Sequence, residues 1–239
     1  MARNLLFLAA GLLAGFVVGF ILANSTGTRD AGGAATQAAT AGASNEKASS
    51  QQLSEKEIRD AIQTTDARPE DVELQKRFGM ALYAYANQTR DPRFLPDAAR
   101  FLKRAVEADP NDRSTTVSLA NLLFDLGQLG DAERFKEART YYQKALELDP
   151  KDVNARTDLG LTYYLGEPSD PQSAIREYRK SLEIDPRHEL TLQNLATALI
   201  KTGSRKEAEK TIETLRGVNP KNDALSDLEA LLAQSSIKS

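Results

Sequence analysis

Apolar residues recur at helical spacing on both sides of one proline in the stretch from Tyr141 to Gly166 of the 239-residue chain. The apolar face before the proline consists of Tyr142, Ala145, Leu146 and Leu148. It stops at Asp149-Pro150, because proline lacks an amide hydrogen and disfavours helical geometry in the residue before it. After a short polar turn, a second apolar face contains Ala155, Leu159 and residues 161–164. The stretch therefore predicts two helices joined by a turn, with Gly160 at a point where a second backbone can approach closely.

The same helix end before a proline recurs along the chain. It occurs at Arg68-Pro69, Asp109-Pro110, Asp149-Pro150, Asp185-Pro186 and Asn219-Pro220. Successive pairs are 41, 40, 36 and 34 residues apart, which predicts a repeated unit of two helices. The extra residues of the longer units fall between their two helices, around 87–96 and 127–135. There they lengthen helices or form loops along one edge, and both neutral drift and a functional edge explain them.

A helix pair with a period near 34 residues resembles the tetratricopeptide repeat, whose signature places leucine, glycine, tyrosine, alanine, an aromatic residue and proline at fixed offsets. In the third unit these positions hold Leu159, Gly160, Tyr163, Ala174, Tyr178 and Pro186. The corresponding residues are Phe78, Gly79, Leu82, Ala98, Leu102 and Pro110 in the first unit, Leu119, Ala120, Leu123, Ala138, Tyr142 and Pro150 in the second, and Leu195, Ala196, Leu199, Ala208, Ile212 and Pro220 in the fourth. The tryptophan of the family pattern is replaced by Gln75, Thr116, Arg156 and Leu192. The resemblance implies an all-α, right-handed α-solenoid of about four helix pairs.

The organisation of the chain follows from these units. We expect an N-terminal partial repeat that caps the stack at 53–71, four repeats at 72–112, 113–152, 153–188 and 189–222, and a C-terminal capping helix and tail at 223–239. Ser54 and Glu57 have the spacing of a capping box, and so do Ser204 and Glu207. The last helix is expected to turn to the fourth repeat an apolar face made of Ala224, Leu225, Leu228, Leu231 and Leu232.

Residues 5–23 form an apolar run without charge or proline, which as a helix spans roughly 28 Å, close to the hydrocarbon thickness of a bilayer. This length favours an uncleaved transmembrane helix over a cleaved signal peptide, whose apolar core is shorter. Because Arg3 precedes the run, residues 1–4 are expected in the cytoplasm and the repeats on the periplasmic or extracytoplasmic side of the inner membrane. Residues 24–52 are small and polar, and are expected to form a flexible, disordered linker.

Gly11, Gly15 and Gly19 recur at every fourth position of the expected membrane helix. They place three residues without side chains on one helix face, where a second copy can approach closely. This pattern predicts a homodimer through the membrane helix. The alternative is that glycine is simply frequent in such helices.

Composition excludes several classes of function. Acidic and basic residues are interspersed and the net charge is -3, so no nucleic-acid partner is expected. The chain has no cysteine, which removes disulfides and thiolate metal sites. Its one histidine, His188, lies in a predicted turn, where a solvated side chain is expected. No motif of a nucleotide-binding, metalloprotease or hydrolase site occurs, so we expect no enzyme, no metal and no cofactor.

A solenoid of helix pairs offers a concave surface lined by the first helix of each pair. On that surface we expect Lys76, Met80, Tyr83, Asn121, Phe124, Thr157, Leu161, Tyr164, Gln193, Asn194 and Thr197. Aromatic rings supply apolar contact and amides pair with a peptide backbone, so these residues predict a groove for a protein or peptide partner. The alternative is that they are solvated or form contacts within the solenoid. Some family members hold a C-terminal carboxylate with lysines and asparagines, but the matching lysines are absent here.

These observations favour a single-pass, membrane-tethered scaffold that holds a protein or peptide partner near the membrane. The architecture resembles bacterial anchored helpers, among them the tetratricopeptide component of cytochrome c maturation and coordinators of cell division or translocation. A self-assembling structural oligomer is the alternative.

Overall fold

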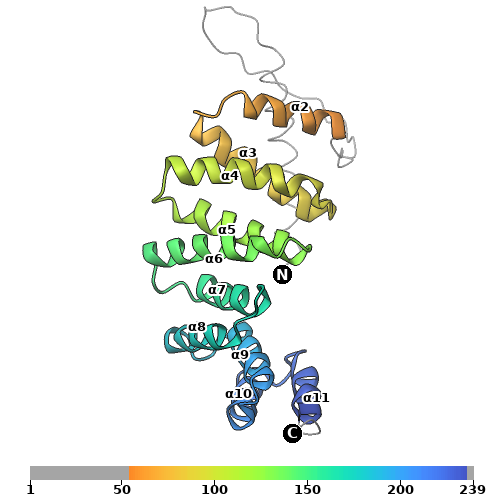
Figure 1. Ribbon diagram of the computed structural model, residues 1–239, viewed down its shortest axis with the longest axis vertical. Helices are drawn as coiled ribbons and strands as arrows, with labels where there is room; N and C mark the ends of the chain where they lie inside the picture. The colour runs from red at the N-terminus through yellow and green to blue at the C-terminus, as the bar shows by residue number, and fades with distance from the viewer. Residues whose placement is uncertain (1–53, 236–239) are drawn as a thin grey trace, which may run out of the picture.

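The computed structural model describes residues 54–235, and this part of the chain contains only helices and turns (Figure 1). The expected membrane helix at 5–23, the linker at 24–52 and the glycine face of Gly11, Gly15 and Gly19 lie outside the described residues. None of the helices between 54 and 235 is both long and apolar enough to cross a bilayer.

The helices follow one another in a regular order. They are α2 (Glu55–Asp66), α3 (Val72–Thr89), the 3₁₀ turn η1 (Pro92–Phe94), α4 (Leu95–Ala108), α5 (Arg113–Gln128), α6 (Glu133–Leu148), α7 (Val153–Leu165), α8 (Pro171–Ile184), α9 (Glu189–Lys201), α10 (Arg205–Val218) and α11 (Leu225–Ser235). Each of α3, α5, α7 and α9 packs most closely against the helix that follows it, and each pair then packs on the next pair. The predicted all-helical stack of helix pairs is thus confirmed.

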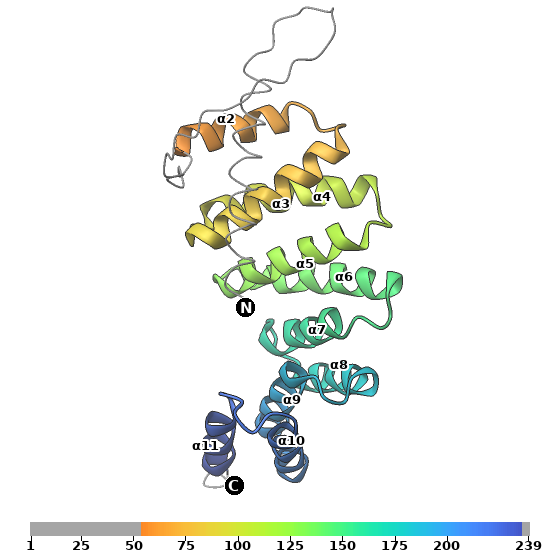
Figure 2. The same ribbon diagram turned by 180° about the vertical axis from the view of Figure 1, so that it is seen from behind.

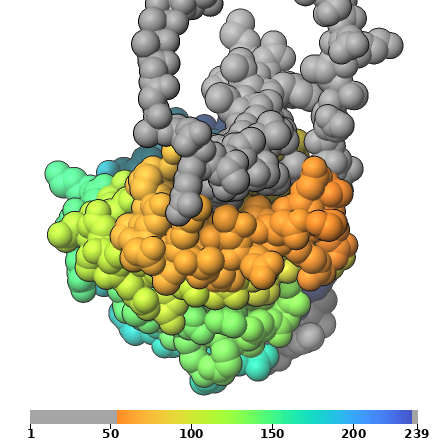
Figure 3. Space-filling model, turned by 90° about the horizontal axis from the view of Figure 1, so that it is seen from above, coloured from red at the N-terminus to blue at the C-terminus, as the bar shows by residue number. Residues whose placement is uncertain are grey.

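The stack is elongated, with α2 at one end and α11 at the other (Figures 1 and 2). The helices near α2 lie across the long axis, whereas α9, α10 and α11 are turned steeply towards it. Seen from above, α2 and the start of α3 cover the N-terminal end of the stack (Figure 3). The small rotation between successive pairs therefore accumulates into a superhelical twist.

The corners between helix pairs share one hydrogen-bonding pattern. The side-chain oxygen of Asp109, Asp149, Asp185 or Asn219 accepts a hydrogen bond from the backbone amide two residues later, at 2.9–3.1 Å. These short side chains mimic a backbone turn, and the proline that follows each of them stops the preceding helix. The next first helix is then capped by Asp112 or Asp152, whose carboxylates accept from the amides of Thr115 and Ala155. This chemistry places successive helix pairs in the same relative orientation.

Helix α2 has the predicted capping box, but α10 does not. The Ser54 hydroxyl accepts from the Glu57 amide at 3.3 Å, and the Glu57 carboxylate accepts from the Ser54 amide at 2.8 Å. Ser204 precedes α10 without any side-chain cap bond, and its hydroxyl lies 3.4 Å from the Thr202 hydroxyl instead. The capping-box prediction for Ser204 and Glu207 is therefore wrong, because the tight turn at Gly203, with φ of 75°, turns the serine towards Thr202.

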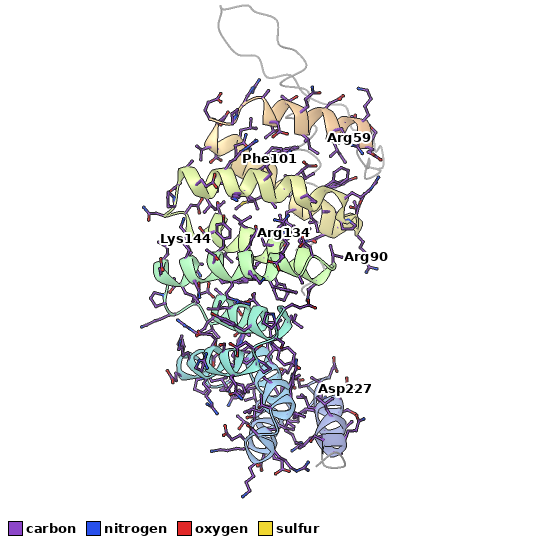
Figure 4. The ribbon with its side chains drawn as sticks, in the orientation of Figure 1. Arg59, Arg90, Phe101, Arg134, Lys144 and Asp227 are labelled. Atoms are coloured by element: carbon purple, nitrogen blue, oxygen red, sulfur yellow. The ribbon has the colours of Figure 1, made fainter. Side chains whose placement is uncertain are left out.

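The core runs the length of the stack. One cluster of buried side chains extends from α2 to α7 and a second from α8 to α11, and Tyr163 packs against both. Phe101 of α4 is fully buried and meets the ring of Phe78 edge-on, with centroids 5.4 Å apart (Figure 4). Such edge-to-face pairs add to the apolar burial that holds one helix pair together.

Four unlike side chains fill the position of the family tryptophan. Leu192 is buried apolar packing, and the Thr116 hydroxyl donates to the Asp112 carbonyl. Arg156 pairs with Glu177 of α8. Gln75 is fully buried, and its amide donates to the carbonyls of residues 65 and 68 at 2.9 Å each, which satisfies the C-terminal end of α2. Hydrogen bonds and one ion pair thus replace a large ring at this position.

At the C-terminal end, α11 buries a narrower face than predicted. Leu225, Leu228 and Leu232 are buried, whereas Leu231 is 42% exposed. The buried residues recur at intervals of three and four, and Leu231 falls about 100° away from Leu232 around the helix axis. The prediction that Leu231 belongs to the buried face is wrong.

The extra residues of the first two units mainly lengthen helices. Helix α3 has 18 residues and α5 has 16, against 13 in α7 and in α9. After α3 the chain turns at Arg90, whose φ is 56°, and forms η1 before α4. The longer helices project along one edge of the stack. Arg90 marks this edge, and Lys144 lies on the opposite edge (Figure 4).

Gly160 allows a close approach, although the neighbour is a side chain and not the second backbone that the sequence suggested. A Cβ atom at Gly160 would lie 2.5 Å from Cε1 of Tyr178, a fully buried residue of α8. A Cβ atom at Gly217 of α10 would meet no other atom within 4 Å.

We expect Gly160→Ala to lower the free energy of unfolding by about 1–2 kcal/mol, because crowding the core costs more than the added helix propensity returns. The matched variant Gly217→Ala is expected to raise it by about 0.5–1 kcal/mol. Urea unfolding followed by circular dichroism measures both, and equal effects of the two variants would contradict the close packing at Gly160.

Candidate functional site

The first helices of the four pairs form one face of the stack. Helix α3 contacts α5 and α7 contacts α9, whereas α5 and α7, and the second helices of neighbouring pairs, contact each other at most marginally. A stack whose first helices approach more closely than its second helices curves towards the first helices. We call the surface formed by α3, α5, α7 and α9 the first-helix face.

Ten of the eleven residues expected on this face are partly exposed there. They are Lys76, Met80, Tyr83, Asn121, Phe124, Leu161, Tyr164, Gln193, Asn194 and Thr197. The eleventh, Thr157, is completely buried, so its predicted exposure is wrong. Its hydroxyl lies 2.6 Å from that of Thr191 on α9 and 3.3 Å from that of Ser181 on α8. Three helices meet at this small side chain, and their packing excludes it from the open face.

His188 belongs to the same polar cluster. Its Nδ1 lies 2.7 Å from the Thr191 hydroxyl, and the side chain is half-buried. The expected solvated histidine is therefore wrong, because the turn folds against the first residues of α9.

Several of the ten exposed residues already have partners within the solenoid. Lys76 forms an ion pair with Asp112, and the Gln193 amide donates to Asn222 at 2.9 Å. The ring of Phe124 meets that of Phe135 edge-on, and the ammonium group of Lys201 lies 4.4 Å from the centre of the Tyr164 ring. These side chains thus stabilise contacts between helices as well as forming the surface.

Two hydrogen bonds link neighbouring helices at the N-terminal half of the face. The Tyr83 hydroxyl of α3 donates to the Asp125 carboxylate of α5 at 2.6 Å. Burial raises the pKa of Asp125, although this hydrogen bond acts in the opposite direction. The Tyr142 hydroxyl of α6 donates to the Asn121 side-chain oxygen at 2.8 Å. Each phenol in this half of the face has an acceptor.

The equivalent tyrosine of the next repeat has no such acceptor. Tyr178 occupies in α8 the position of Tyr142 in α6, and its ring crosses α7 at Gly160. The position of Asn121 is taken in α7 by Leu161, which cannot accept a hydrogen bond. The Tyr178 hydroxyl is buried and has no partner among the described residues. Burial raises the pKa of Tyr178, and the hydroxyl of Tyr164 and the charge of Asp158, both on α7, raise it further.

Asp158 is the functional candidate that sequence reasoning missed. It lies on α7 directly before the Leu159-Gly160 pair, and its carboxylate has no hydrogen bond or ion pair within residues 54–235. Burial, together with the negative charges of Asp152 and Asp125, raises the pKa of Asp158 to about 6. The sequence could have indicated this residue, because an acid stands directly before the Leu-Gly pair at the position that Asn194 holds in the next repeat.

Asn194 adds a second unsatisfied donor. It holds in α9 the position that Asp158 holds in α7, and its Nδ2 atom is buried without a partner in the described part of the chain. Buried polar groups are nearly always hydrogen-bonded, so the buried Tyr178 hydroxyl and Asn194 amide, together with the partly exposed carboxylate of Asp158, are unusual in having no partner among the described residues. Within the described residues, no group of three or more metal-binding side chains occurs.

Comparisons with known proteins find repeat families over part of the chain. A family profile described as Tetratricopeptide repeat matches residues 167–233, and one described as TPR repeat matches residues 120–166. The human protein O-mannosyl-transferase TMTC3 is 29% identical over 131 residues, which are 53% of this chain and 13% of that protein. The chain thus spans only a small part of that relative, whose named activity belongs to the whole protein.

Solved structures share the fold. A crystal structure of MamA superposes with a TM-score of 0.55 at 24% identity, covering 69% of this chain and 88% of MamA. MamA from Desulfovibrio magneticus RS-1 gives 0.55 at 19% identity over 71% of this chain and 87% of its own. YrrB, described as a TPR protein with an unusual peptide-binding site, gives 0.52 at 20% identity over 76% of this chain and 84% of YrrB. At these identities the likeness shows the fold alone.

Proposed function

We propose that this chain, whose helix pairs are tetratricopeptide repeats, is a scaffold that holds a segment of another protein on the first-helix face. The observation that carries the proposal is the unpaired set of Asp158, Tyr178 and Asn194 on adjoining helices. An unsatisfied buried polar group costs about 1–3 kcal/mol, and a bound peptide offers the missing partners in its backbone and side chains. The ordinary use of solenoid surfaces as extended binding sites supports the same function.

The tether is the second part of the proposal. The apolar run at 5–23 would anchor the chain in the inner membrane, with the repeats on the extracytoplasmic side and the linker at 24–52 setting their reach. Within that arrangement, cytochrome c maturation is the pathway that the family resemblance favours. Protease added to intact spheroplasts should digest the repeats of the full chain, and repeats that are protected from the protease would contradict the tether.

A strain that lacks the chain should lose holocytochrome c. A normal amount of holocytochrome c in that strain would contradict the pathway.

Self-association through Gly11, Gly15 and Gly19 remains part of the proposal for the membrane segment. Gly15→Ile should abolish dimers of the full chain in detergent, as measured by light scattering. A dimer that persists in this variant would exclude the glycine face as the contact.

Partner binding on the first-helix face is tested by photo-cross-linking in cells of the source organism. A photoreactive amino acid replaces Met80, Leu161 or Thr197 on first helices, and matched probes replace the exposed Lys103 and Glu147 on second helices. We expect cross-links to a second protein only from the first-helix positions. Cross-links only from Lys103 and Glu147, or from none of these positions, would contradict the proposed function.

A further inference from the structure

We propose that the segment bound on the first-helix face is basic, with an arginine or lysine side chain placed between Asp158 of α7 and Asp125 of α5. This inference rests on the proposed function and names the chemistry of its partner. It follows from the charges that this face leaves unpaired and from the donors beside them.

The two carboxylates lie on neighbouring first helices, Asp125 on α5 and Asp158 on α7. Neither Asp125 nor Asp158 forms an ion pair in residues 54–235, and the charge of Asp125 acts on Asp158 across the α5–α7 boundary. The ionisable side chains around them are Tyr83 from α3, Tyr142 from α6, Tyr164 from α7 and Tyr178 from α8, together with Asp152 at the start of α7. All of these groups are acidic or phenolic, and of the acids Asp152 is paired with Arg113.

The basic side chains of the first helices interact with groups other than Asp125 and Asp158. Lys76 pairs with Asp112 on α5, and Arg77 pairs with Glu73 within α3. Arg113 pairs with Asp152, and Arg156 pairs with Glu177 of α8. Lys201 of α9 stacks on the Tyr164 ring and donates to the Ser169 hydroxyl at 3.1 Å. The charge around Asp125 and Asp158 is therefore negative, and a cationic side chain from a partner compensates it.

The unpaired donors beside Asp158 fit the backbone of the same segment. The unpaired Tyr178 hydroxyl lies on a fully buried side chain whose ring crosses α7 at Gly160, two residues after Asp158, and Asn194, with its unpaired Nδ2 atom, holds in α9 the position of Asp158. Both groups donate hydrogen bonds, and peptide carbonyls are acceptors. A guanidinium or ammonium group on the two carboxylates, with main-chain carbonyls on Tyr178 and Asn194, gives partners to the three unpaired groups and a positive charge to Asp125, which already accepts from Tyr83.

Two other occupants fit less well. A divalent cation needs more oxygen ligands than two carboxylates supply, and the described residues hold no group of three metal-binding side chains. An acidic segment would place further negative charge beside Asp158 and Asp125, which costs free energy.

The same geometry makes binding depend on pH. Because the pKa of free Asp158 is about 6, the carboxylate is largely ionised at pH 7.5 and about one tenth ionised at pH 5. A bound cation favours the ionised form, so acidification weakens binding. We expect affinity for a basic peptide to fall about tenfold from pH 7.5 to pH 5, with Asp158→Asn removing most of that dependence.

The test is selection of random twelve-residue peptides, displayed on phage, against the immobilised full chain at pH 7.5. Enriched peptides are synthesised and their affinities measured by fluorescence anisotropy with the parent and five variants, one of which, Leu161→Arg, changes the first-helix face and keeps both carboxylates. Asp158→Asn and Asp125→Asn remove the two carboxylates, Tyr178→Phe removes one donor, and Asp227→Asn makes the same charge change on α11, at the far end of the stack (Figure 4).

We expect arginine and lysine to be enriched, with affinity reduced about tenfold or more by Asp158→Asn and Asp125→Asn, severalfold by Tyr178→Phe, and unchanged by Asp227→Asn. Enrichment of apolar or acidic peptides that are lost with Leu161→Arg but retained with Asp158→Asn would overturn this inference and leave the proposed function standing. If no selected peptide depends on any first-helix residue, both are overturned.

Discussion

Tyr178→Ala is expected to lower the free energy of unfolding by about 3–5 kcal/mol, the range found when a buried ring is truncated to alanine. The residue is fully buried, its ring lies against α7 at Gly160, and it belongs to the core cluster that joins α8 to α11. Removing it leaves a cavity between α7 and α8, within one helix pair. Urea unfolding of the full chain, followed by circular dichroism, measures the loss, and a loss below about 1 kcal/mol would contradict this packing.

Tyr178→Phe separates the ring from its hydroxyl. The ring stays in place and a buried donor without a partner is removed, so the variant should be as stable as the parent or more stable by about 1 kcal/mol. The matched variant Tyr142→Phe breaks the hydrogen bond to Asn121 and should be less stable than the parent by about 1 kcal/mol. Equal losses in the two variants would mean that Tyr178 has an acceptor in the free protein.

Asp158→Asn is expected to raise the free energy of unfolding at pH 7.5 by about 2 kcal/mol. The pKa of this carboxyl is about 6 in the folded chain and about 3.9 in an unfolded one, so folding disfavours its ionised form. Its contribution to stability is fully present below pH 4 and is lost as the pH rises through 6. The asparagine variant keeps a neutral side chain at every pH.

The measurement is the free energy of unfolding of the parent and of Asp158→Asn between pH 4 and pH 8. The difference between them should grow with pH and level off above about pH 7. Asp227→Asn, an exposed change on α11, should stay within about 0.5 kcal/mol of the parent throughout. A difference that is independent of pH would show that folding leaves the pKa of Asp158 unchanged, which would contradict its burial without a cation.

If Asp158→Asn is both more stable and poorer at binding, the acid is retained for its function, since the free protein is less stable with it. Many functional sites hold groups that the local structure leaves unsatisfied. The pair of measurements therefore separates a binding role from a structural one, because a structural acid would lower stability when it is removed.

The helix pairs could be predicted because a few consecutive residues determine each corner between them. At Asp149-Pro150, the aspartate forms the turn, the proline stops the helix, and Asp152 caps the next one. Such local chemistry does not depend on distant packing. Where a cap depends on the turn before it, as at Ser204 after Gly203, the same spacing gave a wrong prediction.

The candidate site was harder to predict because its chemistry depends on which residues meet across helices. Whether Tyr178 is satisfied is decided by Leu161, seventeen residues earlier, and the sequence pattern placed Leu161 only as an apolar surface residue. In the preceding repeat, Asn121 satisfies Tyr142 from the corresponding position. Comparing equivalent positions of successive repeats shows the difference, whereas the periodicity of one helix does not.

The most direct measurement of the central claim is a structure of the full chain bound to the partner segment recovered by cross-linking. We expect a basic side chain of the segment within hydrogen-bond distance of Asp158 or Asp125, and its backbone carbonyls on the Tyr178 hydroxyl and the Asn194 amide. A partner seated on the second helices, with Tyr178 and Asn194 still unpaired, would contradict the claim that the first-helix face is the binding surface.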